Sequence, residues 1–270
     1  MPAFVYGLNT STIKPASLLD KVRIAAETGY RAIELWHDDL EAFVRGGGTL
    51  AEVKRALDDG GLAVATTIYL KGWFETTAGA HADALDLCRR RLEQAAAVGA
   101  AHVIAGPPAG VADRDLGAAH YRELLALGRE YGVKPAMEFL GFVEDINTID
   151  DAWEIVTKAG DPDGTIVLDP FHIFRGGGSP ERISSLPPEG IAVFHFNDAP
   201  AAPPRALQHD RHRVYPGDGH LDLRGMVRQL ERIGYRGCIS LELFNESLWE
   251  QDPRDVARTG LEKMRAVVET

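Results

Sequence analysis

The chain has 270 residues, 45% of them hydrophobic and 26% charged, which is the composition of a globular protein able to bury a sizeable core. Its formal net charge of -11 at pH 7 disfavours a polyanionic partner, so we expect it to bind no nucleic acid and no anionic membrane. The two cysteines, Cys88 and Cys238, provide neither a disulfide framework nor a CxxC metal site, and we expect both to be reduced core thiols.

The N-terminal segment, residues 1–7, has no basic region, and its apolar run is short, which is unlike a secretory signal. No later apolar run approaches the roughly 20 residues that a membrane-spanning helix needs. These two features predict a cytoplasmic protein.

Short apolar segments alternate with helical patterns along the chain. The helical patterns have apolar residues at i, i+3 and i+4, as in Leu18, Val22 and Ala25. An alternation of strands and helices predicts a parallel sheet. The segments that we expect to form strands are 4–8, 32–36, 63–68, 102–105, 134–138, 165–169, 192–196 and 238–242.

Glycines divide the chain into units of similar length. Seven glycines each come just before an apolar segment, and all but Gly190 follow a helical pattern, where glycine allows the left-handed conformation that ends a helix. The seven are Gly29, Gly61, Gly99, Gly132, Gly160, Gly190 and Gly234. With the N-terminal strand they mark eight β/α units, and about 250 residues is the usual length of a (β/α)8 barrel. We therefore predict a single TIM-barrel domain over residues 1–270.

Four of the expected strands end on, or one residue after, a residue type that ligates metals. Glu138, Asp169 and Glu242 are the last residues of the fifth, sixth and eighth strands, and His195 is next to the last residue of the seventh; these strands are consecutive around a barrel. Their side chains should therefore converge on one part of its mouth. A single carboxylate there often only caps the following helix. Three carboxylates together repel unless a cation neutralises them, which predicts one mononuclear metal site.

Three oxygen ligands and one nitrogen ligand suit a single divalent ion, Mn2+, Mg2+, Co2+ or Zn2+, and the sequence does not choose among them. Open coordination positions would bind a hydroxyl and a carbonyl oxygen of a substrate and stabilise an enediolate. This arrangement predicts proton transfer next to a carbonyl. Glu138 and Glu242 are the candidates to shuttle the proton.

Two long loops, residues 69–78 and 197–222, follow strand ends on the face where barrel enzymes have their active sites. Arg213 in the second loop is a candidate to bind ligand oxygens, with a surface ion pair as the alternative. Trp73 in the first loop is a candidate to stack on substrate. His37, at the end of the second strand, is a candidate to line the cleft. Ordinary packing is the alternative for both.

His172 lies three residues beyond Asp169 and is expected in the loop above the metal. There it is a candidate to contact substrate or to act as acid/base, and a supporting role behind the ligands is the alternative. Glu144 is a weaker acid/base candidate, because a solvated loop carboxylate explains it better.

At these residues the sequence resembles the xylose-isomerase-like TIM barrels, a superfamily of sugar isomerases, sugar epimerases and endonuclease IV. The resemblance covers nearly the whole chain and is strongest from Tyr131 onward. Its carriers are residues 134–141, 147–148, 167–172, 195–198, 213–219 and 240–244. The resemblance implies that Glu138, Asp169, His195 and Glu242 are the metal ligands and that His172 and Arg213 face substrate.

The resemblance also implies a substrate class. The substrate would be a polyhydroxylated ketone, an inosose or a ketose, isomerised or epimerised by proton transfer through a metal-bound enediol. Asn9, His37 and the loop from Lys71 to Glu75 would decide which polyol fits.

Two alternatives remain. One is dehydration of an inosose or a dehydroshikimate-like ring, and the other is a catalytically silent barrel that binds a sugar or a partner chain. Endonuclease chemistry is disfavoured, although Asp210 and His212 resemble its Asp-x-His pair, because the third and fourth strands do not end in histidine. A homodimer through an apolar face near Trp249 is left open.

Overall fold

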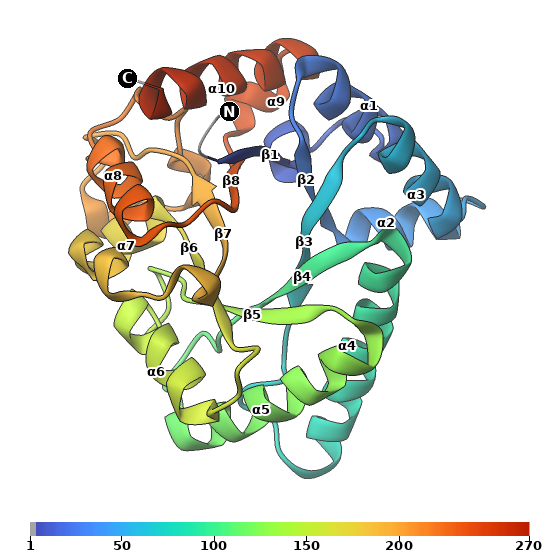
Figure 1. Ribbon diagram of the computed structural model, residues 1–270, viewed down its shortest axis with the longest axis vertical. Helices are drawn as coiled ribbons and strands as arrows, with labels where there is room; N and C mark the ends of the chain where they lie inside the picture. Colours follow the sequence, from blue (N-terminus) through green and yellow to red (C-terminus); the bar gives the residue numbers. More distant parts are fainter. Residues whose placement is uncertain (1–3, 270) are drawn as a thin grey trace.

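The computed structural model describes residues 4–269. Its strands form a closed barrel in which each strand is hydrogen-bonded to its sequence neighbours, and helices surround the barrel (Figure 1). The predicted (β/α)8 barrel is thereby confirmed. Residues 1–3, which formed part of the N-terminal segment considered above, lie outside the described residues.

The strands match most of the segments expected from the sequence. They are β1 (Val5–Asn9), β2 (Ala32–Trp36), β3 (Ala63–Leu70), β4 (Ala100–Ala105), β5 (Lys134–Glu138), β6 (Thr165–Leu168), β7 (Ile191–Phe196) and β8 (Cys238–Leu241). All pairings are parallel, and the barrel closes where Val5 of β1 pairs with Cys238 of β8. The carboxyl ends of all strands therefore open onto one face.

The helices follow the strands in the expected alternation. They are α1 (Leu18–Thr28), α2 (His37–Arg45), α3 (Leu50–Asp59), α4 (Ala78–Val98), α5 (Arg114–Tyr131), α6 (Ile149–Ala159), α7 (Pro170–Gly176), α8 (Leu223–Ile233), α9 (Glu246–Trp249) and α10 (Pro253–Val268). Short 3-10 turns complete the described chain: η1 (Thr10–Ile13), η2 (Pro180–Ser185), η3 (Pro188–Gly190), η4 (Arg205–Leu207) and η5 (Asp210–His212).

Local sequence signals define the helix ends. The Thr148 side chain and Asp151 form a capping box at the start of α6, and Gly160 ends the helix with φ 63° in the left-handed region. Gly190 differs from the other glycines of the pattern, because it closes the 3-10 turn η3 and not an α-helix.

Two ligand candidates lie just beyond their strands. The sequence placed Asp169 and Glu242 as the last residues of strands, but β6 ends at Leu168 and β8 at Leu241. Pro170 occupies the first turn of α7, so Asp169 becomes the residue that caps this helix, and its side chain accepts from the His172 backbone N–H. His172 is accordingly in the first turn of a helix and not in a loop.

The apolar core has two parts. The larger part includes side chains of the helices, such as Leu92 and Leu124, and strand residues such as Leu35. The smaller part is made of strand side chains and fills the barrel interior. Its buried members are Ala32, Ile68, Ile104, Ala136, Val167, Ala192, Val193 and Cys238. Among residues 4–269, no helix has both the length and the apolar character needed to cross a membrane.

Candidate metal centre

The polar side chains at the barrel mouth continue the interior face of the strands. Successive side chains of a strand alternate between its two faces, so His195 lies on the same face as the interior residue Val193. Asp169 follows the interior residue Val167 at the same spacing. Glu138, two residues after Ala136, obeys the same rule. The four predicted ligands are buried, with exposed fractions of 9% or less.

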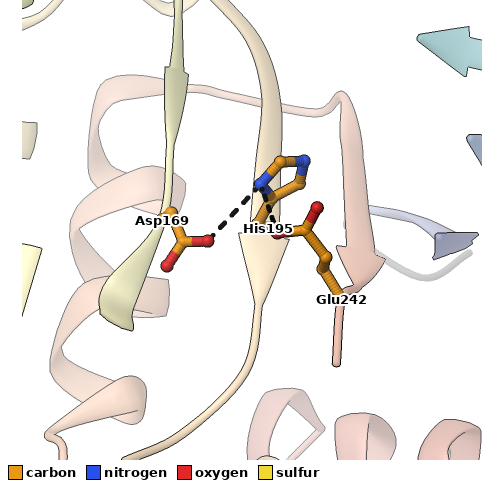
Figure 2. Close-up of side chains that lie close together, drawn as sticks. All are labelled: Asp169, His195 and Glu242. Atoms are coloured by element: carbon orange, nitrogen blue, oxygen red, sulfur yellow. Dashed lines mark ion pairs between the residues drawn. The ribbon is translucent and has the colours of Figure 1, made fainter. Parts of the chain in front are cut away.

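Asp169, His195 and Glu242 form a compact group, and one ligand atom from each lies within 4.8 Å of the other two (Figure 2). The His195 Nδ1 atom is 3.1 Å from Glu242 Oε2 and 3.4 Å from Asp169 Oδ2. Glu138 Oε1 lies 3.5 Å from the same nitrogen and completes the ring of carboxylates around it. The structure thus groups three of the predicted ligands, Asp169, His195 and Glu242, and places the fourth, Glu138, beside His195.

The two nitrogens of His195 have different surroundings. Nε2 faces Glu34 Oε2 at 3.2 Å, inside the barrel. Nδ1 is buried and makes no hydrogen bond of acceptable direction, although three carboxylate oxygens lie close to it. A carboxylate behind one nitrogen is the usual support for a histidine whose other nitrogen binds a metal. The donor set therefore fits a divalent cation placed between Nδ1 and the three carboxylates.

The charges at the mouth perturb the ligands strongly. Burial lowers the pKa of His195, but the Glu242 and Glu34 carboxylates outweigh burial and hold the pKa well above its usual value. Burial, with added repulsion from Glu242 and Asp169, raises the pKa of Glu138 to about 8. Metal binding therefore has to displace protons from these ligands.

Arg213 reaches the same carboxylates from the long loop between β7 and α8. Its Nη1 donates to Asp169 Oδ2 at 2.8 Å and to Glu242 Oε2 at 2.6 Å. The guanidinium lies between the rings of Phe171 and Phe244, at 5.0 and 5.3 Å from their centroids. The side chain is 1% exposed, so this arginine is not a surface residue. It supplies positive charge to the two carboxylate oxygens that also face His195.

Asp198 fastens this loop to the end of β7. Its carboxylate accepts from the backbone N–H groups of Gly217, Gly219 and Leu221, and its own backbone pairs with Val214. A Cβ on Gly219 would come within 2.2 Å of Asp198 Oδ1, so the loop passes too close to Asp198 for a larger residue. Asp198 therefore anchors the loop that carries Arg213 in two ways, through the backbone of Val214 and through the three amides that follow it in the sequence.

Glu242 and Glu138 differ in their hydrogen bonds. Both Glu242 oxygens are occupied, Oε1 by Asn9 Nδ2 at 2.9 Å and Oε2 by Arg213. Within residues 4–269, Glu138 accepts no side-chain hydrogen bond and has only the 3.5 Å contact with His195. A carboxylate without protein donors has oxygens free to accept a proton, which makes Glu138 the better candidate of the two.

His172 contacts Arg213 and the chain after β5. Its Nε2 lies 3.0 Å from Arg213 Nη2, and its Nδ1 lies 3.3 Å from the Gly141 backbone nitrogen, which donates. Both ring nitrogens therefore face groups that can only donate, and a neutral imidazole can accept from one of them. Protein groups thus engage both ring nitrogens, and the geometry favours a role in holding Arg213.

The structure does not bring His37 and Trp73 to the centre. His37 is fully buried at the start of α2, with Nδ1 2.8 Å from Gln94 Oε1 of α4. Trp73 is fully buried against Phe74 and Tyr121. The structure thus agrees with ordinary packing in the interior for both residues, because neither side chain reaches open space.

Other candidates from the sequence also lie apart from the centre. Glu144 is exposed. Asp210 accepts from Arg213, while His212 is half-buried and contacts His209. Trp249 is half-buried, and its Nε1 donates to the Ser11 carbonyl.

Glu34 is the residue of the centre that sequence reasoning missed. It is fully buried in β2 and accepts from Thr66 Oγ1 at 2.5 Å and Asn9 Nδ2 at 3.3 Å, besides facing His195. Burial raises its pKa, but His195 outweighs this effect and lowers the pKa below its usual value. A signal was present: one carboxylate inside the apolar run Ala32–Trp36, two residues after an interior alanine.

Comparison with known proteins places the chain among relatives of the same architecture. A family model described as Xylose isomerase-like TIM barrel matches residues 22–267. The chain belongs to this family. The family resemblance inferred from the residues at the strand ends is thereby confirmed.

Two kinds of curated relative of this xylose isomerase-like barrel are similar in sequence. A 3-dehydroshikimate dehydratase of Pseudomonas aeruginosa is 29% identical over 262 residues, which cover 92% of the chain and 39% of that protein. An inosose isomerase of Bacillus licheniformis is 33% identical over 147 residues, which cover 54% of the chain and 52% of that protein. The chain thus spans about half the length, or less, of these relatives.

Solved structures share the fold. The IOLI protein, whose structure contains a bound zinc atom, superposes with a TM-score of 0.91 at 22% identity, covering 98% of each chain. A fusion of a xylose isomerase-like TIM barrel with 4-hydroxyphenylpyruvate dioxygenase has a TM-score of 0.90 at 25% identity over 98% of this chain and 42% of the other. These likenesses show the same barrel fold over 98% of the chain.

Proposed function

We propose that this protein is a divalent-metal-dependent isomerase or epimerase of a polyhydroxylated ketone. The observation that carries the proposal is the buried His195 Nδ1, which lacks a directed hydrogen bond and faces three carboxylate oxygens. Inosose isomerases are among its relatives, and a likeness to an L-ribulose 3-epimerase structure, with a TM-score of 0.78 at 16% identity, agrees in fold.

Asp169, His195, Glu242 and Glu138 would hold the ion. When bound, it supplies a Lewis acid that polarises the ketone of the substrate and lowers the cost of removing the neighbouring C–H proton. The zinc atom of the IOLI protein supports a divalent ion of this kind.

Glu138 removes the proton in this proposal. It is the carboxylate to which no side chain of residues 4–269 donates a hydrogen bond, so its oxygens are open to accept a proton from the substrate. The C–H proton passes to a Glu138 oxygen and returns to the former carbonyl carbon, while a hydroxyl proton moves between the two substrate oxygens. Atoms therefore balance without any co-reactant. Arg213, directed by His172 and flanked by two aromatic rings, stabilises negative charge on those oxygens.

Dehydration is the second candidate, because the dehydratase relative matches 92% of the chain. Loss of a β-hydroxyl needs an acid aimed at the leaving group. His172, the nearest candidate, has both ring nitrogens opposite N–H donors, and Glu144 is exposed. The geometry at the mouth therefore supports isomerisation over dehydration.

The test is to measure the metal content of protein purified without added metal and then to incubate it with 2-keto-myo-inositol in deuterated water. We expect NMR to show deuterium at carbon in a ketone isomer. A product lighter by one water would replace isomerisation with dehydration. Absence of exchange with a panel of ketoses and inososes would reject the catalytic proposal altogether.

A further inference from the structure

A pocket lies at the carboxyl ends of β1, β2 and β8, on the side of the barrel mouth where Asn9 contacts Glu242. The space inside it that is open to water molecules is about 130 Å³. One enclosed water needs roughly 10–15 Å³ when the volume is measured in the same way. The pocket is therefore large enough for a short chain of hydroxylated carbons. We propose that this pocket is an outer subsite that binds the hydroxyl groups of the substrate farthest from the ketone. The proposal rests on the proposed function and identifies the part of the polyol that this chain recognises.

Two aromatic side chains form one wall of the pocket. Trp36 and Phe244 pack edge to face, with ring centroids 5.8 Å apart. Trp36 Nε1 donates to Asn9 Oδ1 at 3.0 Å, and the amide of Asn9 donates to Glu242 at 2.9 Å. The pocket is therefore separated from a predicted metal ligand by little more than one side chain. Aromatic rings also provide apolar surface for the C–H groups of a polyol.

An ion pair between a buried lysine and a partly exposed aspartate forms the polar wall. Lys21 lies in the pocket lining and is 1% exposed, and its Nζ donates to Asp39 Oδ2 at 2.6 Å. An ammonium has three donors, and Asp39 is the one side chain among residues 4–269 shown to accept from Nζ. Leaving buried donors without acceptors is costly. A ligand hydroxyl beside this pair would accept from the free N–H groups of Lys21 and donate to the Asp39 carboxylate.

Ser11 provides an independent indication of a ligand. It lines the same pocket, is 2% exposed, and its hydroxyl has no hydrogen-bond partner within the described residues. Buried hydroxyls nearly always have a partner, and their exceptions commonly mark a missing ligand or water. The unpartnered serine and the under-used lysine both adjoin this one pocket.

The charges of the lining select the class of ligand. Lys14 and Lys21 are matched in number by Asp38 and Asp39. A phosphate or carboxylate would gain from the lysines and lose against the aspartates, and its net attraction would be small. Neutral hydroxyl groups use both donors and acceptors. The subsite therefore favours an unphosphorylated polyol over a sugar phosphate.

The test compares two ketones in the metal-loaded protein, 2-keto-myo-inositol and the four-carbon ketose erythrulose. We expect Lys21→Met and Asp39→Asn each to raise KM for the inosose by about tenfold to a hundredfold, the effect of losing a hydrogen bond to a charged group. The rise for erythrulose should be at least several times smaller. Lys54→Met, which removes an exposed lysine paired with Asp58, is the matched control. Equal changes for both ketones would overturn the subsite.

Direct binding separates this proposal from the proposed function. Calorimetry with myo-inositol, which has no ketone and is not turned over, is done on the wild type, Asp39→Asn and Lys54→Met. If the wild type isomerises no ketone, binding that is weakened by Asp39→Asn alone leaves the subsite standing and rejects the proposed function. If the wild type is active and Asp39→Asn alters neither KM nor binding, the subsite is rejected. Asp39 is 32% exposed, so its replacement is the variant less disruptive to folding.

Discussion

The His195 imidazole lies 3.2 Å from Glu34 through its Nε2 atom, across the interior of the barrel and 161 residues away in the sequence. This contact requires a proton on Nε2 and leaves Nδ1 to face the three carboxylates. Glu34 therefore determines which nitrogen of His195 is available as a ligand. It does so without belonging to the Asp169–His195–Glu242 group.

Replacing this carboxylate should weaken metal binding. In Glu34→Gln, an amide N–H can donate to Nε2 and so favour the proton on Nδ1. We expect metal affinity, measured by competition with a chelator, to fall by about 10- to 100-fold. Glu34→Asp should lose less, because it keeps a carboxylate. An unchanged affinity in Glu34→Gln would show that Glu34 does not set the tautomer.

Asp169→Asn should lower metal content and activity together. The amide removes one negative ligand and leaves the rest of the side chain in place. Metal analysis of the purified variant, with turnover of the inosose, measures both effects. Asp58→Asn, at an exposed ion pair on α3, serves as control and should bind metal like the wild type. A metal-free Asp169→Asn protein with full activity would contradict the whole assignment.

His172→Ala should keep the metal and lose turnover. Its contact with Arg213 helps to position the guanidinium, and loss of a positioned donor typically costs on the order of 100-fold in kcat/KM. His81→Ala, which removes a histidine paired with Glu123 away from the centre, controls for the loss of an imidazole. Metal loss in His172→Ala would instead make His172 a ligand.

Arg213→Gln should destabilise the metal-free protein more than the metal-bound protein. The arginine neutralises Asp169 and Glu242 at 2.8 and 2.6 Å, and breaking a buried ion pair costs about 3–5 kcal/mol. A bound cation would replace part of that charge and stabilise the folded state by linkage. Thermal unfolding of both proteins, with metal and with chelator, measures the difference. If Arg213→Gln lowers Tm by the same amount with metal and with chelator, Arg213 and the metal do not neutralise the same carboxylates.

Acidification should unfold the protein partly through His37. Burial, with an added contribution from Arg91, lowers the pKa of His37 to about 4, although the Gln94 hydrogen bond opposes this shift. Because the pKa of His37 is lower in the folded state, neutral His37 contributes its full share of stability above pH 6.5, and this contribution is lost as the pH falls toward 4. The linkage amounts to about 2 kcal/mol by pH 5. Urea unfolding at pH 7.5 and 5 should give a smaller difference for His37→Gln than for the wild type. If the wild type and His37→Gln lose the same free energy of unfolding between the two pH values, His37 does not contribute to the acid sensitivity.

The fold was predictable because each β/α unit repeats the same local signals. Glycines such as Gly160 end the helices, and apolar runs such as Ile191–Phe196 are buried along their whole length. Residue types at strand ends also indicated where the site would lie, since the barrel brings consecutive strand ends together.

The features of the site that could not be predicted from the sequence depend on contacts between elements that are distant along the chain. Glu34 could be connected with His195 only once β2 and β7 were placed across one interior. Trp73 was expected at the mouth because it follows a strand, but Phe74 and Tyr121 enclose it. His172 was expected in a loop, whereas Pro170 starts a helix directly after Asp169.

The attachment of the long loop to Asp198 has a consequence for local unfolding. The amides of Gly217, Gly219 and Leu221 donate to the carboxylate of Asp198, which lies two residues after the end of β7. Their protons can exchange with solvent only when Asp198 releases them, so loop and strand end should open as one cooperative unit. A surface segment of this length usually exchanges quickly, but this one will be protected nearly as well as the barrel end to which it is tied.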